Sequence, residues 1–356
     1  MKIGLFGLPQ SGKTTVFAVL TGREVRAADM VRPEAHIGVV HLPDERVDTL
    51  SRLYEPQKTT YTEVTFVDTL ALRRGGAGAA QAQSLGGQLS DADAFALVVG
   101  CFGGAADSVS DLEALLLELA LTDLAVLERR LERLEKERRG GRKDHAAEYE
   151  LLQRCREQLE AGGLLRALEF SEDEDTALRG FALLTQRPML VVANVAEEQA
   201  AAAPAPSAPA PLGPLAACTR ESALPVVSLA AGLELELAAL AGDDQAEIMA
   251  GYGIAELARG RFIRACFELL DLVVFFTANQ NEVRAWTLPR GSTALAAAGK
   301  VHTDMARGFQ GVDVLAFETL GARGSMAECR KQGGVRREGR DYAVQDGDIL
   351  YIHFSA

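Results

Sequence analysis

The chain has 356 residues, a length that suits two or three domains, each with its own core. Hydrophobic residues make up 48% of the sequence, which excludes an intrinsically disordered chain. The formal net charge of -13 at pH 7 excludes a general nucleic-acid coat, so any RNA contact should come from local basic patches.

The cysteines and the hydropathy pattern indicate in which cellular compartment the protein lies. Five cysteines without CxxC spacing indicate reduced thiols in a cytosol. The N-terminus runs directly into a strand pattern, so we expect no signal peptide. The longest apolar run, LLDLVVFF, is too short to span a bilayer. We therefore expect a cytoplasmic protein without a membrane partner.

Apolar runs separated by loops and helical segments open the chain. KIGLFG comes first, and TEVTFVD and AFALVVGCF follow within residues 1–110. PMLVVANV and LPVVSLA continue the series within residues 184–276. Short continuous apolar runs are typical of the buried strands of a parallel sheet, with helices on both faces. We predict one α/β domain built from residues 1–110 and 184–276.

Residues 111–183 follow a different pattern. Leucines recur at helical spacing from Leu112 to Leu134, with arginines and glutamates between them. GGRKD at 140–144 breaks this helix, and a second helical stretch follows at 145–160. The pattern predicts a helical hairpin inserted into the α/β domain. Most of its charges are typical of a solvated face, while the basic turn from Arg138 to Lys143 is either solvated too or an RNA contact.

Two further segments complete the chain. The Ala/Pro tract at 199–214 lacks the apolar residues for a core, so we expect a mobile surface loop. From about residue 277, NEVRAWTLP, VDVLAF and DYAVQDGDILYIHF read as strands around the helical HTDMARGF. Residues 277–356 are therefore predicted to form a small mixed β-grasp module, in which we expect His302 to be structural.

A phosphate-binding loop lies between the first strand and the first helix. The pattern G-x-x-x-x-G-K-[ST] is met where it should be, after a strand and before an amphipathic helix. Its glycines turn backbone N–H groups toward phosphate oxygens, and the helix N-terminus adds the positive end of its dipole. The lysine reaches the β- and γ-phosphates and the threonine hydroxyl binds Mg²⁺. The candidate phosphate-binding residues are Gly7, Leu8, Pro9, Gln10, Ser11, Gly12, Lys13, Thr14 and Thr15.

Two strand ends carry further candidates. Asp68 ends EVTFV, where a Walker B acid would hold Mg²⁺ together with Thr14. Asn194 begins NVAE at the end of another strand, where GTPases carry N-K-x-D. Val195 cannot replace that lysine, and Glu197 is a methylene longer than the aspartate that pairs with guanine. We therefore expect relaxed base specificity or a preference for adenine.

These motifs resemble the YchF, or Obg-like, ATPase family along almost the whole chain. GLPQSGKTTVF is similar to the phosphate loop of that family, and NVAE to its N-x-x-E element, which is associated with a preference for ATP. ELALTDLAVLERRLERLEK resembles its inserted hairpin, and NEVRAWTLPRGSTALAAAGKVHTDMARGF its C-terminal TGS domain. The resemblance implies a G-domain-like P-loop NTPase sheet, ATP hydrolysis with weaker use of GTP, and association with ribosomes.

The chain departs from the family where the γ-phosphate is sensed. Ala71 replaces the glycine of the second switch, and Arg32 stands where the first switch should carry a threonine for Mg²⁺. Leu72 takes the place of the water-positioning glutamine of ordinary GTPases, a position that is normally hydrophobic in this family. Gln10 replaces an asparagine that helps to bind K⁺ in related enzymes, so a K⁺ role stays open.

Two functions from different classes fit these residues. In the first, the protein is a slow ATPase whose candidate catalytic positions are Lys13, Asp68 and Leu72. In the second, it is a nucleotide-binding interaction protein with degenerate switches and little or no turnover. A small-molecule kinase is a more distant third. The expected partners are ATP and the ribosome or its RNA, with no DNA, and we expect a monomer.

Overall fold

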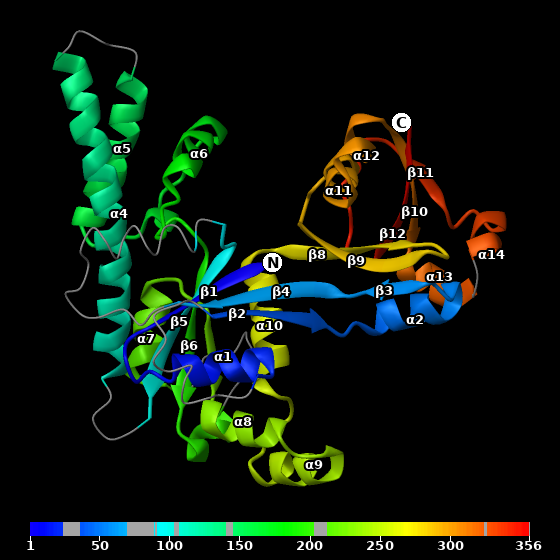
Figure 1. Ribbon diagram of the computed structural model, residues 1–356, viewed down its shortest axis with the longest axis horizontal. Coiled ribbons are helices and arrows are strands. Elements are labelled where there is room, and N and C mark those ends of the chain that lie inside the picture. Colours follow the sequence, from blue (N-terminus) through cyan, green and yellow to red (C-terminus); the bar gives the residue numbers. More distant parts are fainter. Residues whose placement is uncertain are drawn as a thin grey trace. The chain divides into compact units, whose positions relative to one another are not determined.

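The computed structural model describes residues 1–23, 36–69, 89, 91–102, 107–139, 145–202, 212–323 and 326–355 (Figure 1). The chain forms two compact units. The first unit contains Lys2–Gly38 and Thr65–Leu269, and the second contains Met1, Val39–Val64 and Leu270–Ala356.

The first sheet is built on parallel pairings. β1 pairs in parallel with β4 and β5, β5 with β6, and β6 with β7. The order is β2-β4-β1-β5-β6-β7, which needs crossovers that place helices over the sheet. This confirms the predicted α/β fold with a parallel sheet. The strands are β1 (Lys2–Gly7), β2 (His36–Leu42), β4 (Thr62–Asp68), β5 (Ala94–Cys101), β6 (Met189–Val195) and β7 (Val226–Leu229).

Helices cover both faces of this sheet. On one face, Leu112 and Leu115 of α4 and Leu215 of α7 pack in the cluster that holds Phe6 and Phe95. On the other face, α1 contacts α8 and α10, and the ring of Phe66 lies 5.8 Å from that of Phe262 in α10. The helices are α1 (Lys13–Thr21), α4 (Ser108–Arg139), α7 (Pro214–Glu221), α8 (Ala231–Ala238), α9 (Gly242–Gly251) and α10 (Ala258–Leu269).

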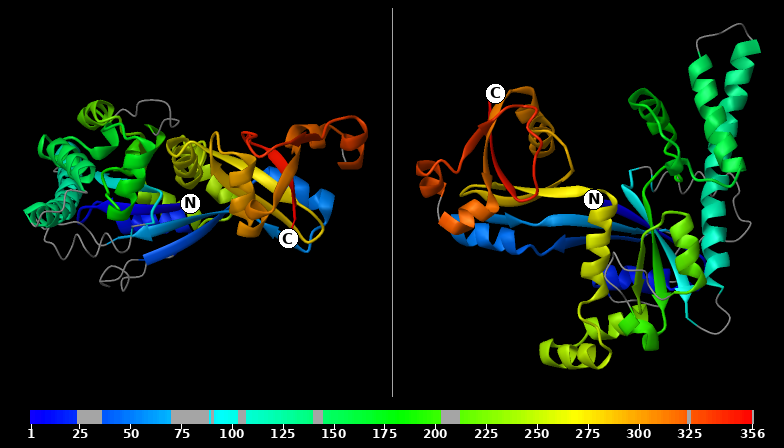
Figure 2. Two further views of the ribbon diagram at one scale, coloured as in Figure 1. Left: turned by 90° about the horizontal axis from the view of Figure 1, so that it is seen from above. Right: turned by 180° about the vertical axis from the view of Figure 1, so that it is seen from behind.

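The predicted helical hairpin is confirmed. α4 begins against the sheet and continues beyond it, and α5 (Ala146–Glu160) lies along its far half (Figures 1 and 2). Leu127, Leu131 and Leu134 of α4 pack there against Leu152 and Leu159 of α5. Arg130 donates two hydrogen bonds to Glu148, at 2.7 and 2.8 Å. The basic turn is only partly described, because residues 140–144 lie outside the described ranges.

A buried carboxylate joins the hairpin to the sheet. Asp123 of α4 is 1% exposed. It accepts hydrogen bonds from the backbone N–H groups of Leu184 and Thr185, at 2.8 and 2.7 Å, and from the Thr185 hydroxyl at 2.6 Å. Leu184 and Thr185 lie on the segment that leads into β6. Burial raises the pKa of Asp123 to about 6, although these hydrogen bonds lower it.

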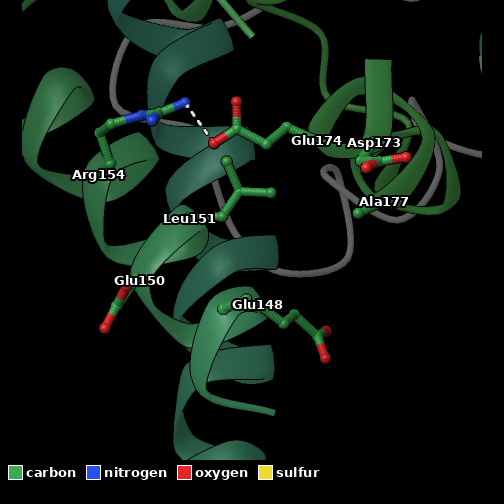
Figure 3. Close-up of a pocket in the computed structure, with 8 residues that line it drawn as sticks. Glu148, Glu150, Leu151, Arg154, Asp173, Glu174 and Ala177 are labelled. Carbon is green, nitrogen blue, oxygen red and sulfur yellow. Dashed lines mark ion pairs between the residues drawn. The ribbon is translucent and has the colours of Figure 1, made fainter. Parts of the chain in front are cut away.

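A cavity of about 420 Å³ lies between α5 and α6 (Glu172–Leu178). Leu151 lies between the two helices, and an ion pair of 3.0 Å between Arg154 and Glu174 crosses the gap (Figure 3). Glu148, which also lines the cavity, is already bound by Arg130. Two of the four carboxylates that line the cavity, those of Glu148 and Glu174, are thus neutralised by arginines of the protein.

The second unit contains a mixed sheet of order β11-β10-β12-β8-β9-β3. β8 and β9 form an antiparallel pair, whereas β12 and β8 are parallel. Its core includes Phe275, Val312 and Leu350. The strands are β3 (Lys58–Thr60), β8 (Leu272–Ala278), β9 (Glu282–Pro289), β10 (Phe309–Ala316), β11 (Arg336–Glu338) and β12 (Asp348–Phe354), and the helices are α2 (Glu45–Tyr54), α11 (Ala294–Val301), α12 (Thr303–Arg307), α13 (Phe317–Arg323) and α14 (Met326–Lys331).

The second unit takes in residues 39–64, which lie inside the predicted segment 1–110. β3 pairs in parallel with β9, Arg46 of α2 lies 2.8 Å from Asp346, and the Tyr54 hydroxyl contacts that of Tyr351. The sequence did not indicate that residues 39–64 belong to the second unit. The strand β3 has only three residues, and its partner β9 lies far along the chain. The boundary at 277 and the TGS assignment stay predictions.

Candidate functional site

The predicted phosphate loop connects β1 to α1. Gly12 precedes α1 with a φ of 81°, a left-handed conformation that favours glycine. A β-carbon on Gly12 would also overlap the side-chain amide of Asn194. The first turn of α1 directs backbone N–H groups into the space above the loop, which suits an anion. Leu8 packs into the core, whereas Pro9 and Gln10 are exposed.

Lys13 and Thr14 meet Asp68 at the carboxyl ends of β1 and β4. The Lys13 ammonium donates to the Asp68 carboxylate and to the Thr69 carbonyl. Burial lowers the pKa of Lys13, while the neighbouring carboxylate raises it. The Thr14 hydroxyl donates to Asp68 Oδ2 at 3.5 Å. His36 approaches the same carboxylate, with Nδ1 3.7 Å from Oδ2.

This donor set fits Mg²⁺ and phosphate. Hydroxyl and carboxylate oxygens are ligands that Mg²⁺ prefers, and Mg²⁺ usually keeps waters and substrate phosphates as its other ligands. Among the described residues, no group of three His, Cys, Asp or Glu side chains could form an all-protein cage. Two buried polar atoms of the site, Ser11 Oγ and His36 Nε2, have no hydrogen-bond partner among the described residues. Both would suit a polar ligand.

Asn194 ties three segments together. It is 5% exposed at the end of β6. Its Nδ2 donates to the Ser11 carbonyl at 3.1 Å, and its Oδ1 accepts from the N–H of Ala231, which begins α8, at 3.0 Å. The Asn194 amide therefore supports the phosphate loop, and its role beside the base stays a prediction.

Val195 and Glu197, the other two candidates in NVAE, have different environments. Val195 is 5% exposed and packs with Ala230 and Leu233 in an apolar cluster. Glu197 is exposed at the start of a 3₁₀ helix, Glu197–Ala202, and a β-carbon on Gly232 would lie 3.8 Å from its Oε1. The Glu197 carboxylate thus lies beside the first turn of α8, the helix whose first N–H donates to Asn194.

Several predicted residues are placed elsewhere or not described. Arg32, Ala71 and Leu72 lie outside the described residues, as does most of the Ala/Pro tract. Thr15 is half-buried in α1. His302 is 60% exposed and caps α12, accepting from the Asp304 N–H at 3.2 Å, which is the structural role expected of it. His36 is the site residue that sequence reasoning missed.

The fold and the loop define the class of the protein: an α/β protein with a P-loop after its first strand. Chains named "Ribosome-binding ATPase YchF" match it over nearly their full length. The one from Escherichia coli O157:H7 is 36% identical with 99% of both chains covered, and that from Bacillus subtilis (strain 168) is 34% identical with 99% of this chain and 98% of the relative covered. The family model YchF-GTPase_C, described as a protein of unknown function, matches residues 272–355.

Solved structures agree with this at the level of the fold. The Schizosaccharomyces pombe YchF GTPase is similar with a TM-score of 0.80 and 23% identity, covering 99% of this chain and 97% of that one. A GTP-binding protein from Pyrococcus horikoshii OT3 gives 0.59 and 20% identity with both chains fully covered. The chain belongs to the YchF family.

Two smaller findings concern the rest of the chain. Within the described ranges, no helix is long and apolar enough to cross a membrane. The five cysteines, all of which are described, are free thiols.

Proposed function

We propose that this protein is a YchF-type P-loop NTPase that binds ATP, and GTP more weakly, hydrolyses ATP slowly and associates with ribosomes in the cytoplasm. The observation that carries the proposal is the meeting of Lys13, Thr14 and Asp68 at the N-terminus of α1. The names of the relatives from Escherichia coli and Bacillus subtilis support ATP as the nucleotide and the ribosome as the partner.

Phosphate binding would redistribute the contacts of Lys13. In the structure its ammonium neutralises Asp68. With a nucleotide present, Lys13 would contact the β- and γ-phosphates, and the N–H groups of the first turn of α1 would hold phosphate oxygens. Thr14 and Asp68 would hold Mg²⁺, which supplies positive charge to the phosphates when it is bound. Asp68 would thereby exchange one cationic partner for another.

The base would lie between Asn194 and Glu197 beside α8. A guanine-specific site places a short carboxylate opposite the base and a lysine stem along it. Here Glu197 is longer, and Val195 is turned into the core, so neither feature is reproduced. A site without a matched partner for guanine loses the discrimination that buried hydrogen bonds provide. We therefore propose ATP as the preferred nucleotide.

Slow cleavage follows from the two altered switches. In-line attack needs a fixed water and a neutralised γ-phosphate, and it depends on positioning and charge rather than on a side-chain base. Leu72 cannot orient water, and Arg32 removes a Mg²⁺ ligand although it adds positive charge. These changes also favour the second candidate function, a nucleotide-binding interaction protein with little or no hydrolysis.

Single-turnover phosphate release with purified protein, ATP and Mg²⁺ separates the two functions, with Lys13→Ala as the control. A slow release that Lys13→Ala abolishes supports the ATPase. Tight ATP binding without release supports the interaction protein. Release that is unchanged in Lys13→Ala would contradict the site itself.

Two basic surfaces are candidates for the ribosome contact. The hairpin ends with Arg138 and Arg139, and the second unit carries the basic run at 330–340. In that run, Arg330 and Arg337 lie 3.6 and 3.1 Å from Asp313, which reduces its net positive charge. We therefore propose the hairpin end as the main RNA contact of a monomeric protein.

A further inference from the structure

His36 lies beside the candidate Mg²⁺ site and takes no part in the roles described so far. It is the first residue of β2, which neighbours β4, the strand that ends at Asp68. Its Nδ1 faces Asp68 Oδ2 at 3.7 Å, and its Nε2 is buried without a partner among the described residues. The ring is therefore half enclosed beside the carboxylate.

The position of His36 is fixed by its neighbours. Its ring centroid lies 6.3 Å from that of Phe17 in α1. Two residues further along β2, a β-carbon on Gly38 would overlap the Thr21 methyl group and lie 3.2 Å from the Phe17 ring. The start of β2 thus packs closely on α1, the helix that carries Lys13 and Thr14. Movement of His36 away from Asp68 would require these contacts to open.

The partners of Asp68 divide between its two oxygens. Lys13 contacts Oδ1, whereas Thr14 and His36 approach Oδ2. If Lys13 turns to the phosphates, His36 is the remaining basic side chain that faces this carboxylate among the described residues. A separation of 3.7 Å is longer than a hydrogen bond, and such contacts often shorten when a site fills.

We propose that His36 is a positioning residue for Mg²⁺ binding: its Nδ1–H donates to Asp68 Oδ2 when Lys13 has turned to the nucleotide, and holds the carboxylate toward the metal. The proposal rests on the proposed function of the phosphate loop. Hydrogen bonds to the ligands of a metal orient them and typically change metal affinity by about 10- to 100-fold. Because His36 acts through Asp68, its loss should affect the Mg²⁺-dependent part of nucleotide binding alone.

The test is titration of the full-length protein with a fluorescent N-methylanthraniloyl derivative of ATP, with and without Mg²⁺. His36→Leu removes both nitrogens, His36→Asn keeps an amide near the Nδ1 position, and His36→Gln keeps one near Nε2. His41→Leu is the matched control, because His41 lies on the same strand with its side chain 59% exposed. Melting temperatures of all variants report whether each one folds.

We expect His36→Leu and His36→Gln to weaken Mg²⁺-dependent binding by about tenfold, with Mg²⁺-free binding unchanged. His36→Asn and His41→Leu should stay within about twofold of the wild type. An equal loss with and without Mg²⁺, or no loss in His36→Leu, would overturn the role of His36. A wild-type protein that binds no nucleotide at all would instead refute the proposed function, and the positioning role with it.

Discussion

Replacing Asp123 with asparagine removes the buried carboxylate of the hairpin while keeping its shape. Burial raises the pKa of Asp123 from 3.8 to about 6, so between these values the folded protein holds a proton that the unfolded chain has released. The stability that this proton provides is fully present below pH 3.8 and is lost as the pH rises through about 6. The rise in pKa corresponds to about 3 kcal/mol, since each pKa unit is worth about 1.4 kcal/mol.

Asparagine does not titrate, so the variant isolates this contribution. We expect the free energy of unfolding of the wild type, minus that of Asp123→Asn, to fall by about 3 kcal/mol between about pH 4 and pH 7. Urea unfolding followed by far-UV circular dichroism measures this difference.

A difference that does not change with pH would refute this reasoning. It would mean that the hydrogen bonds from Leu184 and Thr185 offset the burial of the carboxylate, so that Asp123 has the same pKa in the folded and unfolded chain. A pH dependence of the opposite sign would show that they lower the pKa below its ordinary value.

The remaining predictions concern nucleotide and ribosome binding. Calorimetry should find that ATP binds at least as tightly as GTP, and that Glu197→Asp shifts the ratio of the two affinities toward GTP. A tenfold preference of the wild type for GTP, about 1.4 kcal/mol, would contradict the proposed base site. The amount of protein that co-sediments with ribosomes should fall as the salt concentration rises. It should drop severalfold when Arg138 and Arg139 are replaced by glutamate, with ATP binding unchanged. Normal co-sedimentation of that variant would show that the hairpin end is merely solvated. Ala71→Gly together with Arg32→Thr should speed phosphate release, measured in potassium and in sodium buffers, whereas a fast wild-type rate that the pair leaves unchanged would show that these positions do not limit cleavage.

Most of the features that the sequence predicted correctly depend on local patterns. The phosphate loop is a contiguous motif between a strand and a helix, and the hairpin repeats its leucines at helical spacing. Both depend on neighbours within a few turns of chain, so each could be recognised without knowing what lies opposite. Asp68 and Asn194 were found for the same reason, since each ends an apolar run.

The features that depend on contacts between distant parts of the chain could not be predicted from the sequence. His36 becomes a site residue only because β2 lies next to β4, and nothing in AHIGVV indicates which strand will neighbour it. Asp123 looks like one more charge on a charged helix, yet it is among the most buried polar groups of the chain. Val195 stands in the position of a base-contacting lysine, but the neighbouring apolar cluster takes it into the core.

The pairing of β3 with β9 also sets an order of events during synthesis. Thr60 Oγ1 lies 2.7 Å from Glu282 Oε1, and 222 positions of chain separate the two residues. At about 5–20 residues per second, β3 is synthesised roughly 10–45 s before its partner strand. During that interval the first sheet can form while β3 still lacks its partner strand. The second unit is therefore completed last, and its early segment has to be kept from pairing with other strands until the end of the chain is made.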